Sequence, residues 1–296
     1  MIGEFGHADS FRACFVVDLL RYRGKGSPRT ARTAHAMANT AASDGLHISY
    51  SDRGSGLPVV FLHGVGATSA CWSEQMASLS GAFRCLALDY RGYGKSDVPE
   101  PSAISREAYA RDVIAVMDAA GIESAVLCGN SLGGVVALEV FRTFPERVRK
   151  LVLVDSFAYF PGGAESIPDR LKTLDELGIE RFATTRAPRL FVNGAPESLI
   201  ARAQTDMISI PLAIYKASTS ATWSGDYRAL LPRIDVDTLV VWGEYDTVTP
   251  RPLSDELAEH IATCGSVSVV PGAGHLPQME NPAAFDTLLT DFLTRR

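Results

Sequence analysis

A glycine-rich turn between an apolar run and a helix-like segment is the feature that most constrains how this chain can fold. The run at 124–128 is typical of a buried strand, and Gly-Asn-Ser-Leu-Gly-Gly at 129–134 follows it directly. A Gly-x-Ser-x-Gly turn between a strand and a helix is typical of a nucleophile elbow, in which strained backbone angles lift the serine clear of the sheet. Gly129 and Gly133 fit this turn because a Cβ at either position would clash where helix and strand meet. The pattern predicts Ser131 as a candidate nucleophile, although this motif taken alone would fit a plain glycine-rich strand-to-helix turn about as well.

His275 is the candidate base for this serine. A nucleophilic serine needs a base that takes its proton, and histidine fills that role most often. Of the six histidines, His275 is the only one beyond the serine in a strand-to-helix loop, and the proline and glycines at 271–274 can aim its imidazole at a fixed point. His260 lies on a helical face and is expected to be solvated. His63 follows a strand-like run, but we expect it to brace the backbone there.

A carboxylate at a strand end is expected to orient this base. Asp246 closely follows the strand-like run 238–242, and a buried aspartate there would accept the N–H of His275 and fix its tautomer. Glu244 is a weaker competitor, because its longer side chain is expected to point to solvent. Asp155 is a more serious one, since it also ends a strand-like run. The sequence favours Asp246 and leaves Asp155 open.

Two further segments complete a resemblance to a known family. The run 57–62 leads into His-Gly-Val-Gly at 63–66, and Asp-Tyr-Arg-Gly-Tyr-Gly-Lys-Ser at 89–96 follows another strand-like run. Together with the serine turn and the loop of His275, these segments resemble the α/β-hydrolase superfamily over roughly residues 43–296. The resemblance is specific for the fold and only weakly informative about the substrate.

The resemblance implies an α/β fold with a mostly parallel central sheet flanked by helices and a helical cap insertion. It orders the catalytic triad as serine, acid and base, here Ser131, Asp246 and His275. It assigns the oxyanion hole to the backbone N–H groups of Val65 and Leu132, so that side chains there can vary. It also implies that Asp89 and Arg91 stabilise the structure of their own loop and are not catalytic groups.

The pattern along the chain predicts three parts. Strand-like and helix-like runs alternate through most of the sequence, which implies a parallel sheet covered on both faces. Between 157 and 233 the strand-like runs stop and helical segments appear at 169–177, 180–185, 197–207 and 212–219. We predict a flexible N-terminal extension at 1–42, a core at 43–156 and 234–296, and a cap at 157–233.

The cap is expected to supply most of a largely apolar substrate pocket. Most of its apolar side chains should form the core of the cap and the rest should line the pocket. These residues are Phe160, Phe182, Leu190, Phe191, Met207, Ile208, Ile210, Ile214, Tyr215 and Trp223.

The first 36 residues stand apart from the rest. Basic residues outnumber acidic ones there, a periodic apolar pattern is missing, and Gly-Lys-Gly-Ser-Pro at 24–28 is typical of a flexible segment. We expect a loosely attached extension. A short basic targeting peptide remains an alternative, as does an apolar turn at 11–20 that docks on the cap or on a second subunit of a homodimer.

Composition excludes several classes of function. The net charge of −6 gives no basic patch for nucleic acid, and the longest apolar runs are strand-sized, which predicts no membrane span. The cysteines show no metal-ligand spacing and are expected to be buried, reduced thiols in the cytoplasm. They are Cys14, Cys71, Cys85, Cys128 and Cys264. We expect neither a cofactor nor a metal.

These features predict a serine hydrolase that cleaves a small apolar carboxylic ester or lactone through an acyl-enzyme. The segment 187–191 is similar to that of enol-lactonase-type members. The runner-up is hydrolysis of a C–C bond in a meta-cleavage-type dienoate. Hydrolases of that class often carry the elbow Gly-Asn-Ser-(Leu/Met)-Gly-Gly, which favours this alternative. Their oxyanion loop, however, usually has more glycines than the loop at 63–67 has here. A ligand-sensing receptor of the same fold is a third interpretation, which slow or single turnover would identify.

Overall fold

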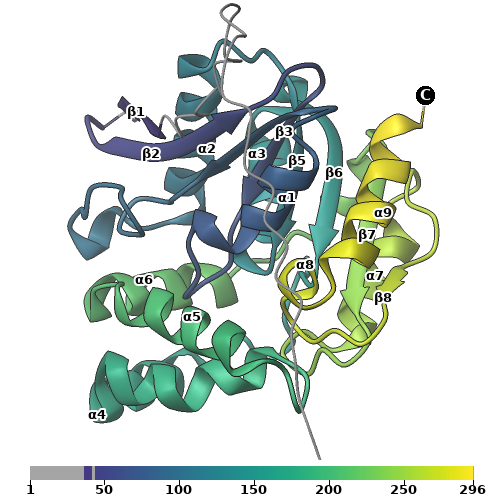
Figure 1. The fold of residues 1–296 in the computed structure, drawn as a ribbon. Coiled ribbons are helices and arrows are strands. Elements are labelled where there is room, and N and C mark those ends of the chain that lie inside the picture. The colour runs from purple at the N-terminus through teal and green to yellow at the C-terminus, as the bar shows by residue number, and fades with distance from the viewer. Residues whose placement is uncertain (1–36, 42–43, 296) are drawn as a thin grey trace, which may run out of the picture. The chain divides into compact units, whose positions relative to one another are not determined.

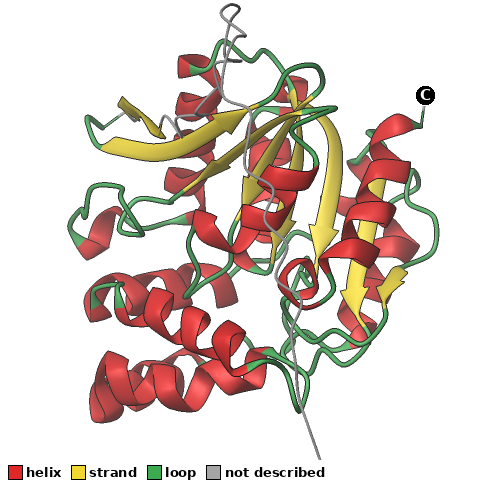
Figure 2. Ribbon diagram, viewed as in Figure 1, coloured by secondary structure: helices red, strands yellow, loops and turns green. Residues whose placement is uncertain are grey.

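The computed structural model describes residues 37–41 and 44–295. In this part of the chain an eight-stranded sheet has the order β1-β2-β4-β3-β5-β6-β7-β8 (Figures 1 and 2). Its strands are β1 (Met37–Ala41), β2 (His47–Arg53), β3 (Pro58–Leu62), β4 (Arg84–Leu88), β5 (Ala125–Asn130), β6 (Val148–Val154), β7 (Thr238–Gly243) and β8 (Ser268–Val270). β2 pairs antiparallel with both β1 and β4, whereas β4, β3, β5, β6, β7 and β8 pair parallel in this order, which confirms the predicted mostly parallel sheet.

Helices flank this sheet and fill the long connection between β6 and β7. They are α1 (Ser73–Ser78), α2 (Arg106–Ala119), α3 (Leu132–Thr143), α4 (Ile167–Arg186), α5 (Glu197–Ile208), α6 (Leu212–Trp223), α7 (Arg251–His260), α8 (Pro277–Glu280) and α9 (Pro282–Thr294). A short 3₁₀ helix, η1 (Ser69–Trp72), precedes α1, and another, η4 (Ala187–Leu190), follows α4. Local sequence sets several of the boundaries. For example, the Ser105 hydroxyl accepts the N–H of Ala108 and so caps α2.

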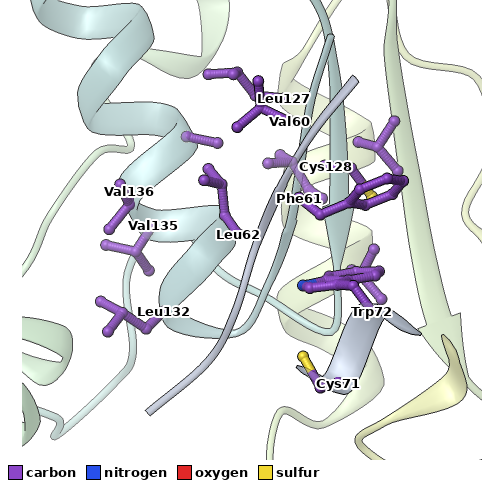
Figure 3. Packing of buried hydrophobic residues seen from close by; sticks show 14 of the residues in the cluster. Val60, Phe61, Leu62, Cys71, Trp72, Leu127, Cys128, Leu132, Val135 and Val136 are labelled. Carbon is purple, nitrogen blue, oxygen red and sulfur yellow. The ribbon is translucent and has the colours of Figure 1, made fainter. Parts of the chain in front are cut away.

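The side chains of β3 alternate between two apolar layers. Phe61 points toward Trp72, with their ring centroids 5.1 Å apart, and Trp72 in turn packs against Phe285 of α9. Leu62 points the other way, toward Val135 of α3 (Figure 3). Because successive side chains of a strand face opposite sides of a sheet, an almost continuously apolar strand needs helices on both sides. This explains why the buried strands lack a polar–apolar alternation.

The predicted N-terminal extension at 1–42 is wrong for its last residues. Residues 37–41 form β1, which pairs with β2 in the register Met37 opposite Ser51 and Ala41 opposite His47. An edge strand is recruited by the unpaired backbone groups of its neighbour, so its side chains need no periodic apolar pattern. Residues 1–36, with the predicted flexible segment and its alternatives, lie outside the described residues.

The segment between β6 and β7, which we call the cap segment (157–233), contains α4, α5 and α6. These helices lie beyond the end of the sheet toward which β6 points (Figure 1). The two helical segments predicted at 169–177 and 180–185 form one element, α4, which is interrupted at Gly178 with φ 68° and ψ 168°. Glycine alone adopts such angles without strain, so the sequence marks the break.

Polar contacts fix the cap segment to the core. Tyr109 of α2 shares a buried hydrogen bond of 2.7 Å with the Ser218 hydroxyl of α6. Arg106 donates to the Ala221 carbonyl at 2.7 Å, and the Tyr227 hydroxyl donates to Glu139 at 2.9 Å. Hydrogen bonds that involve charged groups are stronger than neutral ones, and these contacts set the position of the cap segment over the strand ends.

Candidate active site

Ser131 lies at the sharp turn between β5 and α3. Its φ of 54° and ψ of −117° are outside the regions that a residue with a side chain normally occupies. A Cβ added to Gly129 would lie 2.2 Å from the carbonyl carbon of Gly133, and one added to Gly133 would lie 2.1 Å from the Leu62 carbonyl oxygen. The prediction that glycine is needed at both positions is therefore confirmed, and the close packing of β5, α3 and β3 maintains the strained serine.

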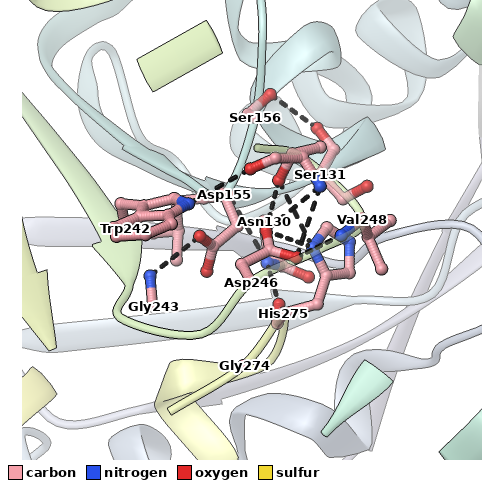
Figure 4. A network of polar contacts seen from close by, with 12 residues as sticks. Asn130, Ser131, Asp155, Ser156, Trp242, Gly243, Asp246, Val248, Gly274 and His275 are labelled. Carbon is pink, nitrogen blue, oxygen red and sulfur yellow. Dashed lines mark hydrogen bonds and ion pairs between the residues drawn. The ribbon is translucent and has the colours of Figure 1, made fainter. Parts of the chain in front are cut away.

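His275 and Asp246 form a buried pair. The His275 Nδ1 and the Asp246 Oδ2 are 2.9 Å apart, and both side chains are almost inaccessible to solvent (Figure 4). Asp246 also accepts the backbone N–H of Val248 at 2.7 Å and the hydroxyl and N–H of Thr249. Burial by itself would raise the pKa of Asp246, but the His275 ring together with these donors outweighs it and holds that pKa below its usual value.

The competing carboxylates make other contacts. Asp155 follows β6, and its Oδ1 accepts the Gly243 N–H at 2.9 Å (Figure 4). Burial, followed by the charge of Asp246, raises the pKa of Asp155 well above its ordinary value. Glu244 accepts the N–H of Gly272 at 2.9 Å. The described structure brings Asp246, and neither of the other two, into hydrogen-bond contact with His275.

Backbone contacts hold His275 in place. Its N–H donates to the Leu190 carbonyl of η4 at 2.9 Å, and its carbonyl accepts the Asn130 side-chain amide at 3.0 Å. The loop that contains His275 is thus hydrogen-bonded both to the cap segment and to the residue before Ser131. Within the described residues, no hydrogen bond joins the Ser131 hydroxyl to the His275 ring.

The loop after β3 passes directly beside Ser131. A Cβ added to Gly64 would lie 3.2 Å from the Ser131 Cβ. His63 braces this loop, since its Nδ1 donates to the Gly64 carbonyl at 2.9 Å and its Nε2 accepts the Tyr90 N–H at 3.2 Å. Burial lowers the pKa of His63. Both ring nitrogens are occupied, in accord with the expected bracing role.

Asp89 and Arg91 tie together the loop that follows β4. Asp89 accepts the N–H groups of Ser69 at 2.8 Å and Lys95 at 3.0 Å. Arg91 is buried and bonds Asp112 through two nitrogens, at 2.6 and 2.5 Å. The predicted structural roles of both residues are confirmed.

One cavity of about 260 Å³ joins these elements to the cap segment. Ser131, His275 and Val65 line it from the core. Five of the ten apolar cap residues considered from sequence also line it: Phe182, Leu190, Met207, Tyr215 and Trp223. The volume lies just below the usual range of roughly 300–1,000 Å³ for small-molecule sites, so the cavity suits a short substrate.

Comparison with known protein families assigns the chain to one of them. The α/β hydrolase fold family matches residues 58–282, which is most of the chain. The chain belongs to this family. Its α/β-hydrolase fold places Ser131, Asp246 and His275 in loops that follow β5, β7 and β8, all at the carboxyl ends of parallel strands.

Related α/β-hydrolases catalyse several hydrolytic reactions. The chain is 30% identical over 273 residues to 2-hydroxymuconate semialdehyde hydrolase from Pseudomonas sp. (strain CF600), covering 84% of this chain and 91% of the relative. It is also 30% identical over 233 residues to 3-oxoadipate enol-lactonase 2 from Acinetobacter baylyi, covering 77% and 85%. A solved thermophilic esterase from Thermogutta terrifontis has a TM-score of 0.80 at 28% identity and covers 87% of this chain and 98% of its own. The protein is therefore an enzyme of the hydrolase class.

Sequence reasoning missed three arginines of this α/β-hydrolase that line the cavity. They are Arg170 and Arg186 of α4 and Arg189 of η4. The sequence carried one signal for them, namely cationic residues interspersed in a cap that is otherwise rich in apolar side chains. Helical spacing could not show which of these cations face the cavity, because that depends on how α4 packs on the core.

The sequence also led to predictions about the cysteines, metal binding and membrane spans of this hydrolase. Cys71, Cys85 and Cys128 are buried thiols and Cys264 is half-buried, while Cys14 lies outside the described residues. Among residues 37–41 and 44–295, no group of three or more His, Cys, Asp and Glu side chains could hold a metal. In the same ranges no helix is long and apolar enough to cross a membrane.

Proposed function

We propose that this α/β-hydrolase cleaves a carboxylic ester or lactone through an acyl-enzyme formed on Ser131. The observation that carries the proposal is the arrangement of the strained serine and the buried His275–Asp246 pair around one cavity. The relatives named as an enol-lactonase and an esterase support it, since a lactone and an ester react by the same acyl transfer.

In the first half-reaction, the Ser131 Oγ attacks the acyl carbon while the His275 Nε2 takes the hydroxyl proton. Asp246 stays a carboxylate, consistent with its lowered pKa, and stabilises the imidazolium that forms. The backbone N–H groups of Val65 and Leu132 are the proposed donors to the oxyanion. Gly64 supports this assignment, because it brings the loop that contains Val65 into contact with Ser131.

The first half-reaction ends when His275 gives this proton to the leaving alcohol oxygen, the bond between the acyl carbon and that oxygen breaks, and the acyl group remains on Ser131. In the second half-reaction, a water molecule loses a proton to His275 and attacks the acyl carbon. The bond between that carbon and the Ser131 Oγ then breaks, His275 returns the proton to Ser131, and the acid is released. The cap segment covers the cavity and limits the access of other water. A preference for small substrates follows from the cavity volume of about 260 Å³.

Mass spectrometry of acid-quenched reactions tests this proposal. We expect p-nitrophenyl acetate and short lactones to be hydrolysed and the quenched protein to gain the mass of the acyl group. The Ser131→Ala variant should show neither turnover nor the adduct. Turnover of all esters and lactones at the buffer rate would contradict the proposal.

Hydrolysis of a C–C bond is the second candidate function. The relative named 2-hydroxymuconate semialdehyde hydrolase is as similar in identity as the lactonase, and the Gly-Asn-Ser-Leu-Gly-Gly turn favours this class. The loop at 63–67 carries fewer glycines than such hydrolases usually have, which favours the ester or lactone reaction. A dienoate included in the same substrate screen distinguishes the two candidates.

A further inference from the structure

Three arginines of the cap segment line the cavity that also contains Ser131 and His275. Arg170 lies in the first half of α4, Arg186 is the last residue of that helix, and Arg189 follows in η4. Arg170 and Arg186 are partly buried, whereas Arg189 is exposed. The chain as a whole carries a net charge of −6, so this accumulation of positive charge in the cavity is local.

Arg186 lines the cavity without an anionic partner among the described residues. Among the described residues it forms no ion pair and no side-chain hydrogen bond, whereas Lys216 of the same segment pairs with Asp175 at 2.6 Å. Burial lowers the pKa of the Arg186 guanidinium, partly offset by Tyr215 and Asp246, and the charge of Arg189 lowers it further. A guanidinium remains charged in a protein at neutral pH, so Arg186 is a cation that has lost water without gaining a counter-ion.

Arg170 adds a second positive charge on the same helix. Its guanidinium lies 4.0 Å from the centre of the Trp223 ring, and its Nε donates to the Ser166 hydroxyl at 2.8 Å. Burial lowers the pKa of Arg170, and the charge of Arg186 lowers it further. The Trp223 contact fixes the side chain and leaves its other donors free for a ligand.

Carboxylates of the protein do not neutralise this charge. Among the described residues that line the cavity, Asp206 is the single acidic one. Burial raises the pKa of Asp206, and the charge of Arg202 and a hydrogen bond with Thr68 oppose this shift. The side of the cavity formed by α4 therefore keeps its excess of positive charge in the absence of a ligand.

We propose that Arg186, with Arg170 beside it, binds a carboxylate carried by the substrate. The planar guanidinium forms two parallel hydrogen bonds to a carboxylate, which compensates the lost hydration and also orients the scissile bond. The substrate is then a short ester or lactone that bears an acid group, and the expectation of a purely apolar substrate is revised. This inference rests on the proposed hydrolysis only for its reaction, because carboxylate binding can be measured without turnover.

Two pairs of esters test the inference by activity. In the first, mono-p-nitrophenyl glutarate and its methyl ester differ by a charge on the acyl side. In the second, 4-acetoxybenzoate and its methyl ester differ by a charge on the alcohol side. We expect wild type to favour the acid over its neutral counterpart in kcat/KM in at least one pair. Arg186→Met should reduce that ratio roughly tenfold or more.

Arg181→Met is the matched control. Arg181 lies on the same helix, is exposed and does not line the cavity, so its removal should leave the ratio unchanged. Arg186→Lys keeps the charge but cannot form bidentate hydrogen bonds to a carboxylate, so it should retain only part of the preference for the acid over the neutral ester. A ratio that is equally large in Arg186→Met and wild type would overturn the inference.

Binding to the Ser131→Ala variant separates this inference from the proposed function. We expect calorimetry to show binding of monomethyl glutarate and much weaker binding of dimethyl glutarate, and the difference should vanish when Arg186→Met is added. If neutral esters are cleaved with no preference for acids and the two ligands bind alike, the inference fails and the proposed function stands. If the acid binds through Arg186 and no ester or lactone is cleaved, the proposed function fails and the inference stands.

Discussion

At the scale of single residues, two aspartates that follow neighbouring strands have opposite environments. Asp246 is surrounded by donors, namely His275, Thr249 and the Val248 amide, and its pKa is lowered. Asp155 has one backbone donor, and burial followed by the charge of Asp246 raises its pKa well above the ordinary value. Burial and the adjacent charge of Asp246 both disfavour the ionised form of Asp155, so its carboxyl group keeps a proton to higher pH than an ordinary aspartate does.

The aspartates should differ sharply on mutation. Asp246→Asn should lower kcat by about 10⁴-fold, because an amide there favours the wrong tautomer of His275. Asp155→Asn should stay within roughly tenfold of wild type, since an amide is neutral like a protonated carboxyl group and keeps an oxygen that can accept the Gly243 N–H. Steady-state kinetics on one ester checks both. A larger loss in Asp155→Asn than in Asp246→Asn would assign the orienting role to Asp155.

The raised pKa of Asp155 also predicts how stability depends on pH. The folded state binds a proton more tightly than the unfolded state does, so the free energy of unfolding should fall as pH rises above the ordinary pKa of a carboxyl group. Asp155→Asn removes this titration. Urea unfolding should be measured between pH 5 and pH 8, a range of roughly 3 units in which the unfolded carboxyl group is mostly ionised. The free energy of unfolding should fall less across this range in the variant than in wild type. An identical loss in both would contradict the prediction.

Ser131 and His275 should behave as one unit. Ser131→Ala and His275→Ala are each expected to lower kcat by on the order of 10⁴-fold or more, and the double variant should be little worse than either. Circular dichroism should show that all three variants remain folded. Losses that multiply in the double variant would mean that the two residues act in separate steps.

At the scale of secondary-structure elements, close contacts between β5, α3 and β3 hold the serine turn. Leu62 at the end of β3 meets Gly133 in the first turn of α3, where there is no space for a side-chain atom. The helix therefore begins directly behind Ser131. The strain at one residue is thus maintained by three elements.

Gly133→Ala should destabilise this junction. The new Cβ would lie 2.1 Å from the Leu62 carbonyl oxygen, so the backbone must shift, and we expect a loss of about 3 kcal/mol in the free energy of unfolding together with most of the activity. Gly81→Ala is the control, because a Cβ there meets no atom within 4 Å. Equal unfolding midpoints in urea for the two variants would contradict the packing argument.

At the scale of the whole molecule, the site is assembled from segments far apart in the sequence. The loops after β5, β7 and β8 meet because parallel strands end at the same edge of the sheet, and the cap segment then covers that edge. Residues 1–36 precede all of these segments. The location of the protein and its oligomeric state stay predictions from the sequence.

A chain that begins at Met37 tests the role of the N-terminal residues. It keeps β1 and its pairing with β2, so we expect the fold and the esterase activity to be retained and the thermal midpoint to shift by no more than roughly 5 °C. Activity assays, thermal unfolding and light scattering check this. A loss of activity or a change in oligomer mass would instead support docking of the segment 11–20 on the cap segment or on a second subunit.

The sequence by itself determined the strand–turn–helix around Ser131, the loop of His275 and the change from strands to helices after β6. These features are local, since glycine, proline and apolar spacing act on the backbone within a few residues. Only the tertiary structure decided which aspartate meets His275, that residues 37–41 add an edge strand, and that Arg186 lines the cavity. Each of these outcomes depends on contacts between segments that are distant in the sequence. Residue type alone does not determine which residues come together there, because the folded positions of the segments do.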